Sequence, residues 1–199
     1  MADCPQIRQQ MRKQRNALSS LQQLDAARRV ERLIASSHLF RNSQHIACYS
    51  ANDSELNLES LIERIWLAKK VCYLPVLDSI HKNRLWFAPY YPDSKLRLNR
   101  FGIPEPLCNK RELVRARSLD LILTPLVAFD KEGNRLGMGG GFYDRSLAFL
   151  LRRSHWHKPR LCGVGYDFQR VNHLPSQPWD VPLSAIVTEC ARYKPEPSL

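Results

Sequence analysis

Glycines crowd a short stretch in the second half of the chain. Five of the eight glycines lie between residues 133 and 141, within the segment DKEGNRLGMGGGFYDR that runs from Asp130 to Arg145. Glycine adopts positive φ readily, and successive exposed backbone amides form a nest that binds anions. Arg135 and Arg145 add charges that suit phosphate oxygens. The segment therefore predicts a phosphate site, and a tight turn that needs small residues is the structural alternative.

The loop differs from two familiar nucleotide motifs. No Gly-Lys-Ser or Gly-Lys-Thr closes it, as a Walker A loop requires, and Phe142 stands at the final glycine position of G-x-G-x-x-G. A helix is expected from Phe142 to Leu151, and its first amides and dipole favour phosphate. Asp144 would then be either an acid of the first helical turn or a metal ligand. We also expect positive φ at Gly140, so that valine there would block the phosphates.

The loop follows an apolar strand, expected over 119–125, that belongs to an alternating series of strands and helices. Further strands are expected over 45–50, 71–76, 85–90, 161–166 and 185–188, and a helix that starts at Leu58 and ends near Lys69 and Lys70. This alternation predicts an α/β fold: a three-layer sandwich with a mainly parallel central sheet, helices on both faces and an N-terminal helical pair. Ligands bind at the carboxyl ends of the strands in such folds.

The chain is expected to form one domain over residues 1–199, with a helical segment over 1–40 and an α/β body over 45–190. Ser19 and Gln22 have the spacing of a capping box that starts the second helix. Its apolar stripe is expected to comprise Leu21, Leu24, Ala27, Val30, Leu33 and Ile34. Residues 91–118 are polar with scattered prolines and are expected to be mainly loop.

Charge and composition narrow the class of partner. The chain carries 30 basic and 19 acidic residues, a formal net charge of +11, which attracts anions. Nucleic acid and a polyanionic small molecule both fit that charge, but no dense basic run or aromatic RNA-binding signature is present. No apolar run approaches the roughly 20 residues of a membrane span, and the first 20 residues lack a secretory pattern. We expect a cytoplasmic protein without a nucleic-acid or membrane partner.

Other catalytic and metal motifs are missing from the sequence. G-x-S-x-G and H-E-x-x-H do not occur, and the six cysteines contain no C-x-x-C pair, which favours buried reduced thiols. His155 and His157 flank Trp156 in a basic linker and are expected to have no metal role.

The stretch LTPLVAFDKEGNRLGMGGGFYDR, residues 123–145, resembles the signature of the 5-formyltetrahydrofolate cyclo-ligase family. The resemblance covers nearly the whole chain, because weaker pieces occur in the family's order. These are the N-terminal basic helix, the turn over 50–55, GIPEP at 102–106 and LPSQPWDVPLSAIVTE at 174–189. The glycine loop is the specific element.

The resemblance implies a set of binding residues. In the family, a lysine of the first helix is followed four positions later by an arginine, and Arg8 stands here in the place of the lysine. On the first helix it implies ATP contacts from Arg8, Gln9, Gln10, Met11 and Arg12. In the loop it implies ATP contacts from Arg135, Leu136, Gly137, Met138, Gly139, Gly140, Gly141, Phe142 and Tyr143. For the folate it implies Ser50, Glu55, Met138, Gly139, Gly140, Gly141 and Phe142.

Several of these residues have a structural alternative. Arg8 and Arg12 suit a solvated helix face, Glu55 suits a helix N-terminus, and Asp180 suits an Asx-turn. The resemblance instead implies that Asp144 and Asp180 lie near Mg²⁺.

The resemblance also implies a reaction: ATP-dependent cyclisation of 5-formyltetrahydrofolate, including polyglutamylated forms, to 5,10-methenyltetrahydrofolate. Arg135 and Tyr143 are its implied catalytic residues, and the enzyme is expected to be a monomer. Two alternatives are a regulator that binds nucleotide or folate without turnover and a basic RNA-binding protein.

Overall fold

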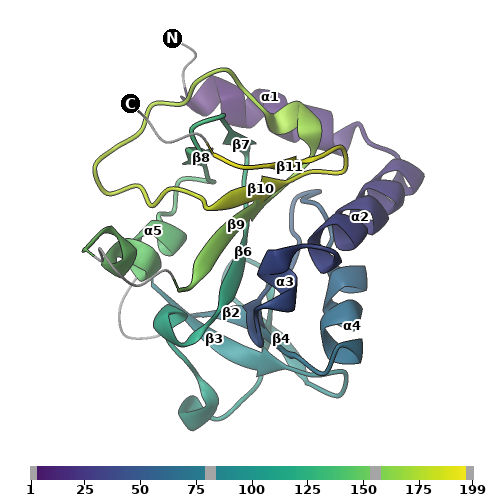
Figure 1. Ribbon diagram of the computed structural model, residues 1–199, viewed down its shortest axis with the longest axis vertical. Coiled ribbons are helices and arrows are strands. Elements are labelled where there is room, and N and C mark those ends of the chain that lie inside the picture. The colour runs from purple at the N-terminus through teal and green to yellow at the C-terminus, as the bar shows by residue number, and fades with distance from the viewer. Residues whose placement is uncertain (1–3, 79–83, 153–157, 196–199) are drawn as a thin grey trace.

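The computed structural model describes residues 4–78, 84–152 and 158–195 (Figure 1). His155 and His157 lie outside these residues. The helices are α1 (Cys4–Asn16), α2 (Ser20–Ala35), α3 (His38–Arg41), α4 (Glu59–Leu67) and α5 (Phe142–Leu147). Short 3-10 turns cover Lys110–Glu112, Ala116–Ser118, Ala148–Arg152 and Asp167–Gln169. No helix within the described ranges is long and apolar enough to cross a bilayer.

A seven-stranded sheet forms the centre of the molecule. Its strands, in spatial order, are β11 (Arg192–Tyr193), β10 (Ala185–Val187), β9 (Arg160–Val164), β6 (Leu121–Pro125), β1 (His45–Ala47), β2 (Val71–Leu77) and β3 (Leu85–Tyr90). The five inner strands are parallel, and the edge strands β3 and β11 pair antiparallel to their neighbours. The expected mainly parallel α/β sheet is confirmed.

Alternate residues of the strands face two separate apolar cores. Ile46 and Leu121 pack in the core with α2 and α4, whereas Ala47 and Ile122 pack in the core with Leu147 of α5. Successive strand residues point to opposite faces, so near-continuous apolar strands require helices on both sides. Figure 1 shows α2 and α4 on one side of the sheet and α5 on the other, which is the expected three-layer arrangement.

The second helix begins as expected but buries only part of the expected stripe. The side chain of Ser19 accepts the amide of Gln22, and the side chain of Gln22 accepts the amide of Ser19. Ala27, Val30 and Ile34 are buried, whereas Leu21 and Leu24 of the first turns are 79% and 48% exposed. The expectation for these two leucines was wrong, because α2 contacts the rest of the core only through its later turns.

Two small hairpins occur where the sequence shows no strand pattern. β4 (Leu96–Leu98) pairs with β5 (Pro104–Pro106) inside the region expected to be loop, and β7 (Ala128–Phe129) pairs with β8 (Arg135–Leu136) ahead of the glycine loop. The expected helix from Phe142 is α-helical only to Leu147 and continues as a 3-10 turn. The six cysteines are free thiols, with Cys48, Cys72 and Cys162 buried as expected.

Candidate active site

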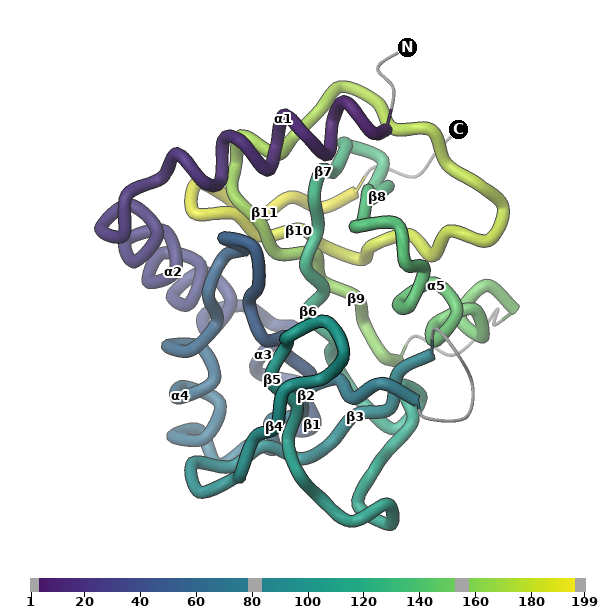
Figure 2. Tube along the Cα trace, turned by 180° about the vertical axis from the view of Figure 1, so that it is seen from behind, coloured from purple at the N-terminus to yellow at the C-terminus, as the bar shows by residue number. Residues whose placement is uncertain are grey.

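Helix α1 connects two segments that lie far apart in the sequence. It crosses the hairpin of β7 and β8 (Figure 2), and the Nε of Arg8 donates to the carbonyl oxygen of Gly137 at 2.9 Å. Four residues later on the same helical face, Arg12 pairs with Asp53 at 2.7 Å. The turn that contains Asp53 follows β1, and the glycine loop follows β6 through the hairpin. The helix therefore brings together two loops from the carboxyl side of the sheet, where α/β folds bind ligands.

The glycine loop has the backbone of an anion nest at two positions. Gly139 and Gly141 have φ values of +96° and +64°, whereas Gly140 does not have positive φ. The expectation for Gly140 was therefore wrong: a Cβ there would instead approach the ring of Phe142 to 2.7 Å. Gly141 precedes α5 as its N-cap, so the predicted helix start at Phe142 is confirmed. Because α5 has only six residues, the loop amides rather than a helix dipole are the main anion-binding feature.

Two arginines contact this loop from different elements, and a third lies just before it in the chain. Arg145 donates to the carbonyl oxygen of Gly140 at 2.8 Å from α5, and Arg8 contacts the loop from α1. Arg135, on β8, has a side chain that is 7% exposed, donates to the carbonyl oxygen of Val181 at 2.6 Å and forms an ion pair with Asp144. Positive charge therefore lies on both sides of the amide nest, which is the arrangement that suits a polyphosphate.

The turn after β1 holds the second group of expected site residues. Ser50 donates to the carbonyl oxygen of Pro104 at 3.1 Å, which ties the turn to β5. The carboxylate of Glu55 accepts the amide of Asn52 at 3.2 Å, and the amide of Glu55 donates to the carbonyl oxygen of Asn52 at 3.0 Å. Glu55 precedes α4 by four residues, so the alternative of an N-terminal helix acid was wrong.

Burial gives Glu55 an unusual protonation equilibrium. Loss of hydration raises the pKa of its carboxyl from 4.5 to about 7, and the nearby Asp53 adds to the rise. The amide of Asn52 and the charge of Arg15 oppose it. The carboxyl therefore changes charge near neutral pH, a property that is common among functional carboxylates.

This raised pKa predicts a stability that declines with increasing pH. The folded protein holds the Glu55 proton more tightly than the unfolded chain does. The stabilisation contributed by the protonated carboxyl is therefore full below pH 4.5 and is lost as the pH rises through 7. After a discount for partial exposure, we expect the free energy of unfolding to fall by about 2 kcal/mol over this pH range. Urea unfolding of Glu55→Gln should show a flatter pH profile between these values, while the exposed Glu59→Gln should keep the original profile. Equal profiles for the parent and Glu55→Gln would contradict the assignment.

An aromatic contact joins the end of the glycine loop to the turn of the β4–β5 hairpin. The ring of Phe101 packs edge-on against Phe142 with centroids 5.8 Å apart, and Phe101 and Met138 are each about half exposed. Burial raises the pKa of Tyr143, and the charge of Glu55 raises it further, so the phenol stays protonated at neutral pH. Phe101 was not among the expected site residues, because its hairpin has no clear strand pattern.

The remaining residues expected to contact ATP differ in exposure, because some are buried and others face solvent. Met11 and Leu136 are buried in one apolar cluster with Ile7, so their side chains serve packing. Gln9 and Gln10 are exposed on α1. A nucleotide role for these four positions stays a prediction, and for Met11 and Leu136 it would involve only the backbone.

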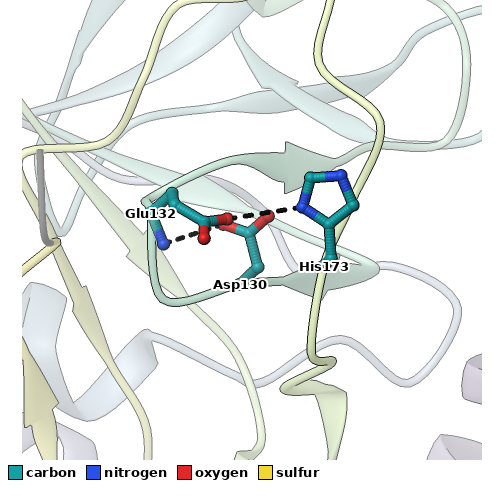
Figure 3. A group of neighbouring side chains, drawn as sticks. All are labelled: Asp130, Glu132 and His173. Carbon is teal, nitrogen blue, oxygen red and sulfur yellow. Dashed lines mark hydrogen bonds and ion pairs between the residues drawn. The ribbon is translucent and has the colours of Figure 1, made fainter. Parts of the chain in front are cut away.

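Two groups of acidic residues could be considered for a cation. Asp130, Glu132 and His173 lie together (Figure 3), but the two oxygens of Asp130 accept four hydrogen bonds, from the amides of Glu132, Asn134 and Leu174 and the side chain of Asn134. A carboxylate offers about four acceptor positions, so this one is saturated. Asp130 therefore organises its loop.

Asp144 and Asp180 lie nearer the glycine loop. Arg135 contacts both Asp144 and the carbonyl of Val181, which follows Asp180, so the two acids belong to one region. Asp180 accepts the amide of Gln177 at 2.8 Å, which confirms its place in a turn. Oxygen donors from two carboxylates beside a phosphate nest fit Mg²⁺, which usually takes one or two carboxylates together with phosphates.

Comparisons with known proteins agree on one family. The model of the 5-formyltetrahydrofolate cyclo-ligase family matches residues 1–189. The chain is 42% identical over 184 residues to the 5-formyltetrahydrofolate cyclo-ligase of Haemophilus influenzae, covering 92% of this chain and 95% of the relative. It is 39% identical over 180 residues to that of Escherichia coli K12, with coverages of 89% and 96%. The NMR structure of Aquifex aeolicus 5,10-methenyltetrahydrofolate synthetase superposes with a TM-score of 0.80 at 31% identity, covering 98% of this chain and 95% of that chain.

Proposed function

Because the chain belongs to the 5-formyltetrahydrofolate cyclo-ligase family, we propose that it converts 5-formyltetrahydrofolate to 5,10-methenyltetrahydrofolate at the expense of ATP. The chain is thus an enzyme of the ligase class. The single observation that supports the role of ATP is the glycine loop, in which two residues with positive φ lie between Arg8 and Arg145. Backbone amides and guanidinium groups are the donors that a polyphosphate needs.

The proposed reaction proceeds in two stages. The formyl oxygen attacks the terminal phosphorus of ATP, the bond from that phosphorus to the bridging oxygen breaks, and ADP leaves. The neighbouring N10 of the folate then attacks the activated formyl carbon and loses its proton. The carbon–oxygen bond breaks, and phosphate departs with the former formyl oxygen. This chemistry requires alignment and positive charge more than a protein nucleophile.

The described residues supply those requirements from two sides. Arg135, held by Asp144 and by the carbonyl of Val181, places a fixed positive charge next to the loop. Tyr143 retains its phenolic proton and remains a donor for an oxygen of the reacting groups. Asp144 and Asp180 would hold Mg²⁺, which when bound neutralises phosphate charge.

Glu55 and the exposed aromatic ring of Phe101 suit the folate. A carboxylate pairs with the amino group and ring N–H donors of a pterin, and a partly enclosed carboxylate makes such hydrogen bonds stronger than a solvated one does. Ser50 lies in the same turn, tied to Pro104. Phe142 of the glycine loop contacts Phe101 in the hairpin to which Ser50 is tied, and Met138 is half exposed in the same loop. Both substrates would therefore meet at residues 138–142.

The proposal is tested by following the methenyl-folate absorbance after mixing the purified protein with 5-formyltetrahydrofolate, ATP and Mg²⁺. We expect the band to grow only when ATP and Mg²⁺ are both present. No growth, with ATP binding still detected by calorimetry, would contradict the catalytic proposal and favour a regulator. Omission of each component in turn is the internal control.

A further inference from the structure

Arg15 is a buried charge on α1 that the family resemblance does not assign. Its side chain is 1% exposed, and its Nη2 donates to Asp53 at 3.0 Å. Among the described residues, its Nε and Nη1 atoms have no hydrogen-bond acceptor. A buried arginine is costly unless its charge is balanced, so a merely structural role would favour an apolar residue here.

Asp53 belongs to the same turn that presents Glu55. Asp53 and Ser54 have φ values of 52° and 57°, a conformation that is uncommon outside glycine. Two arginines of α1 hold Asp53, one buried and one exposed: Arg15 and Arg12. The hydrogen bonds between Asn52 and Glu55 then close the turn. The direction of the Glu55 carboxylate is therefore fixed by contacts that begin at Arg15.

We propose that Arg15 is a positioning residue for the folate, because it anchors Asp53 and places a buried positive charge near the carboxylate of Glu55. Arg15 acts through Glu55, favouring its ionised form and orienting it towards the pterin. The inference rests on the proposed function in one respect, which is that Glu55 receives the pterin.

The charges around Glu55 determine the direction in which each substitution should shift its pKa. Arg15 lowers the pKa of Glu55, whereas Asp53 and burial raise it. Tyr49 and Tyr143 also face this carboxyl, and the pKa of each is raised, so both remain neutral near pH 7. Removal of Arg15 must therefore raise the pKa of Glu55, and removal of the Asp53 charge must lower it.

Three variants separate this effect from general damage. Arg15→Met removes the buried charge, and Arg15→Lys restores the charge without the planar fork. Asp53→Asn removes the opposing charge, and asparagine tolerates positive φ as well as aspartate does. Lys13→Met, at an exposed position of the same helix, changes the net charge equally and is the matched control.

The first measurement is the titration of the Glu55 carboxyl by ¹³C NMR in the ligand-free protein, assigned by its loss in Glu55→Gln. We expect the midpoint, near 7 in the parent, to rise by about one pH unit in Arg15→Met and to fall in Asp53→Asn. Lys13→Met and Arg15→Lys should stay close to the parent. This titration does not depend on turnover, so it remains informative even if the cyclisation assay fails.

The second measurement is the pH dependence of the KM for 5-formyltetrahydrofolate. Because only the ionised carboxylate accepts the pterin donors, KM should rise as the pH falls through the pKa of Glu55. In Arg15→Met the KM for 5-formyltetrahydrofolate should be about fivefold higher than in the parent at pH 7. Its kcat and its KM for ATP should stay within about twofold of the parent values. Unchanged titration midpoints in both Arg15→Met and Asp53→Asn would overturn the proposal. An equal rise in the KM values for 5-formyltetrahydrofolate and ATP in Arg15→Met would overturn it too. If Arg15→Met does not fold, Arg15→Gln, which keeps a hydrogen-bond donor for Asp53 without the charge, takes its place: a raised Glu55 midpoint supports the proposal and an unchanged midpoint contradicts it.

Discussion

Replacement of Arg135 by methionine should lower kcat for the cyclisation about 1,000-fold. Charge develops on the phosphoryl group as it passes from ATP to the formyl oxygen, and a guanidinium already held in place stabilises it without reorganisation. The side chain of Arg135 is 7% exposed, and its guanidinium is fixed at both ends by Val181 and Asp144. Steady-state rates of methenyl-folate formation at saturating ATP and folate measure the effect.

A control is required because methionine leaves Asp144 without its ion-pair partner. Arg135→Lys retains a positive charge and should recover part of kcat, although a lysine cannot hold both partners as a fork does. Thermal unfolding of both variants shows whether the fold survives. A well-folded Arg135→Met with kcat within threefold of the parent would remove Arg135 from the proposed catalytic residues.

Gly139→Val is the second change with a large expected effect. The backbone at Gly139 has φ of +96°, where a β-branched residue is strongly disfavoured. The loop should therefore leave its nest conformation, and ATP affinity measured by calorimetry should fall about 100-fold. Glu55, the proposed partner of the pterin, lies on another element, so folate affinity should fall less than ATP affinity, and its loss should come only from the contacts proposed for residues 138–142.

Gly137→Ala is the matched change in the same loop. Gly137 does not have positive φ, and a Cβ there would meet nothing within 4 Å. We expect a loss of ATP affinity below about tenfold, since added bulk is tolerated where the backbone is ordinary. Equal losses for Gly137→Ala and Gly139→Val would mean that loop flexibility, rather than the positive φ of Gly139, determines nucleotide binding.

Local chemistry and periodicity explain which features could be predicted from the sequence. The capping box of Ser19 and Gln22 depends on residues only three positions apart. The buried strand β6 is predicted by a continuous apolar run. Glycine spacing predicted a loop with positive φ, which Gly139 and Gly141 have, because glycine adopts that conformation without steric cost. These signals were sufficient for the parallel sheet, its covering helices and the start of α5.

Features that depend on long-range contacts could not be predicted in the same way. Arg15 and Asp53 are 38 positions apart, and nothing in either local pattern indicates their ion pair. Leu21 fits the helical period of α2 but extends beyond its contact with the core. At Gly140 the requirement for glycine is the nearby ring of Phe142, which only the folded loop reveals.

The most direct test of the central claim follows the formyl oxygen. The enzyme would be supplied with 5-formyltetrahydrofolate carrying ¹⁸O in the formyl group, together with ATP and Mg²⁺, and the released phosphate would be examined by ³¹P NMR. Phosphorylation of the formyl oxygen predicts one ¹⁸O atom in each phosphate released with the methenyl product. Methenyl-folate formed together with unlabelled phosphate would contradict the mechanism. In that case water, and not the formyl oxygen, would attack the terminal phosphorus of ATP.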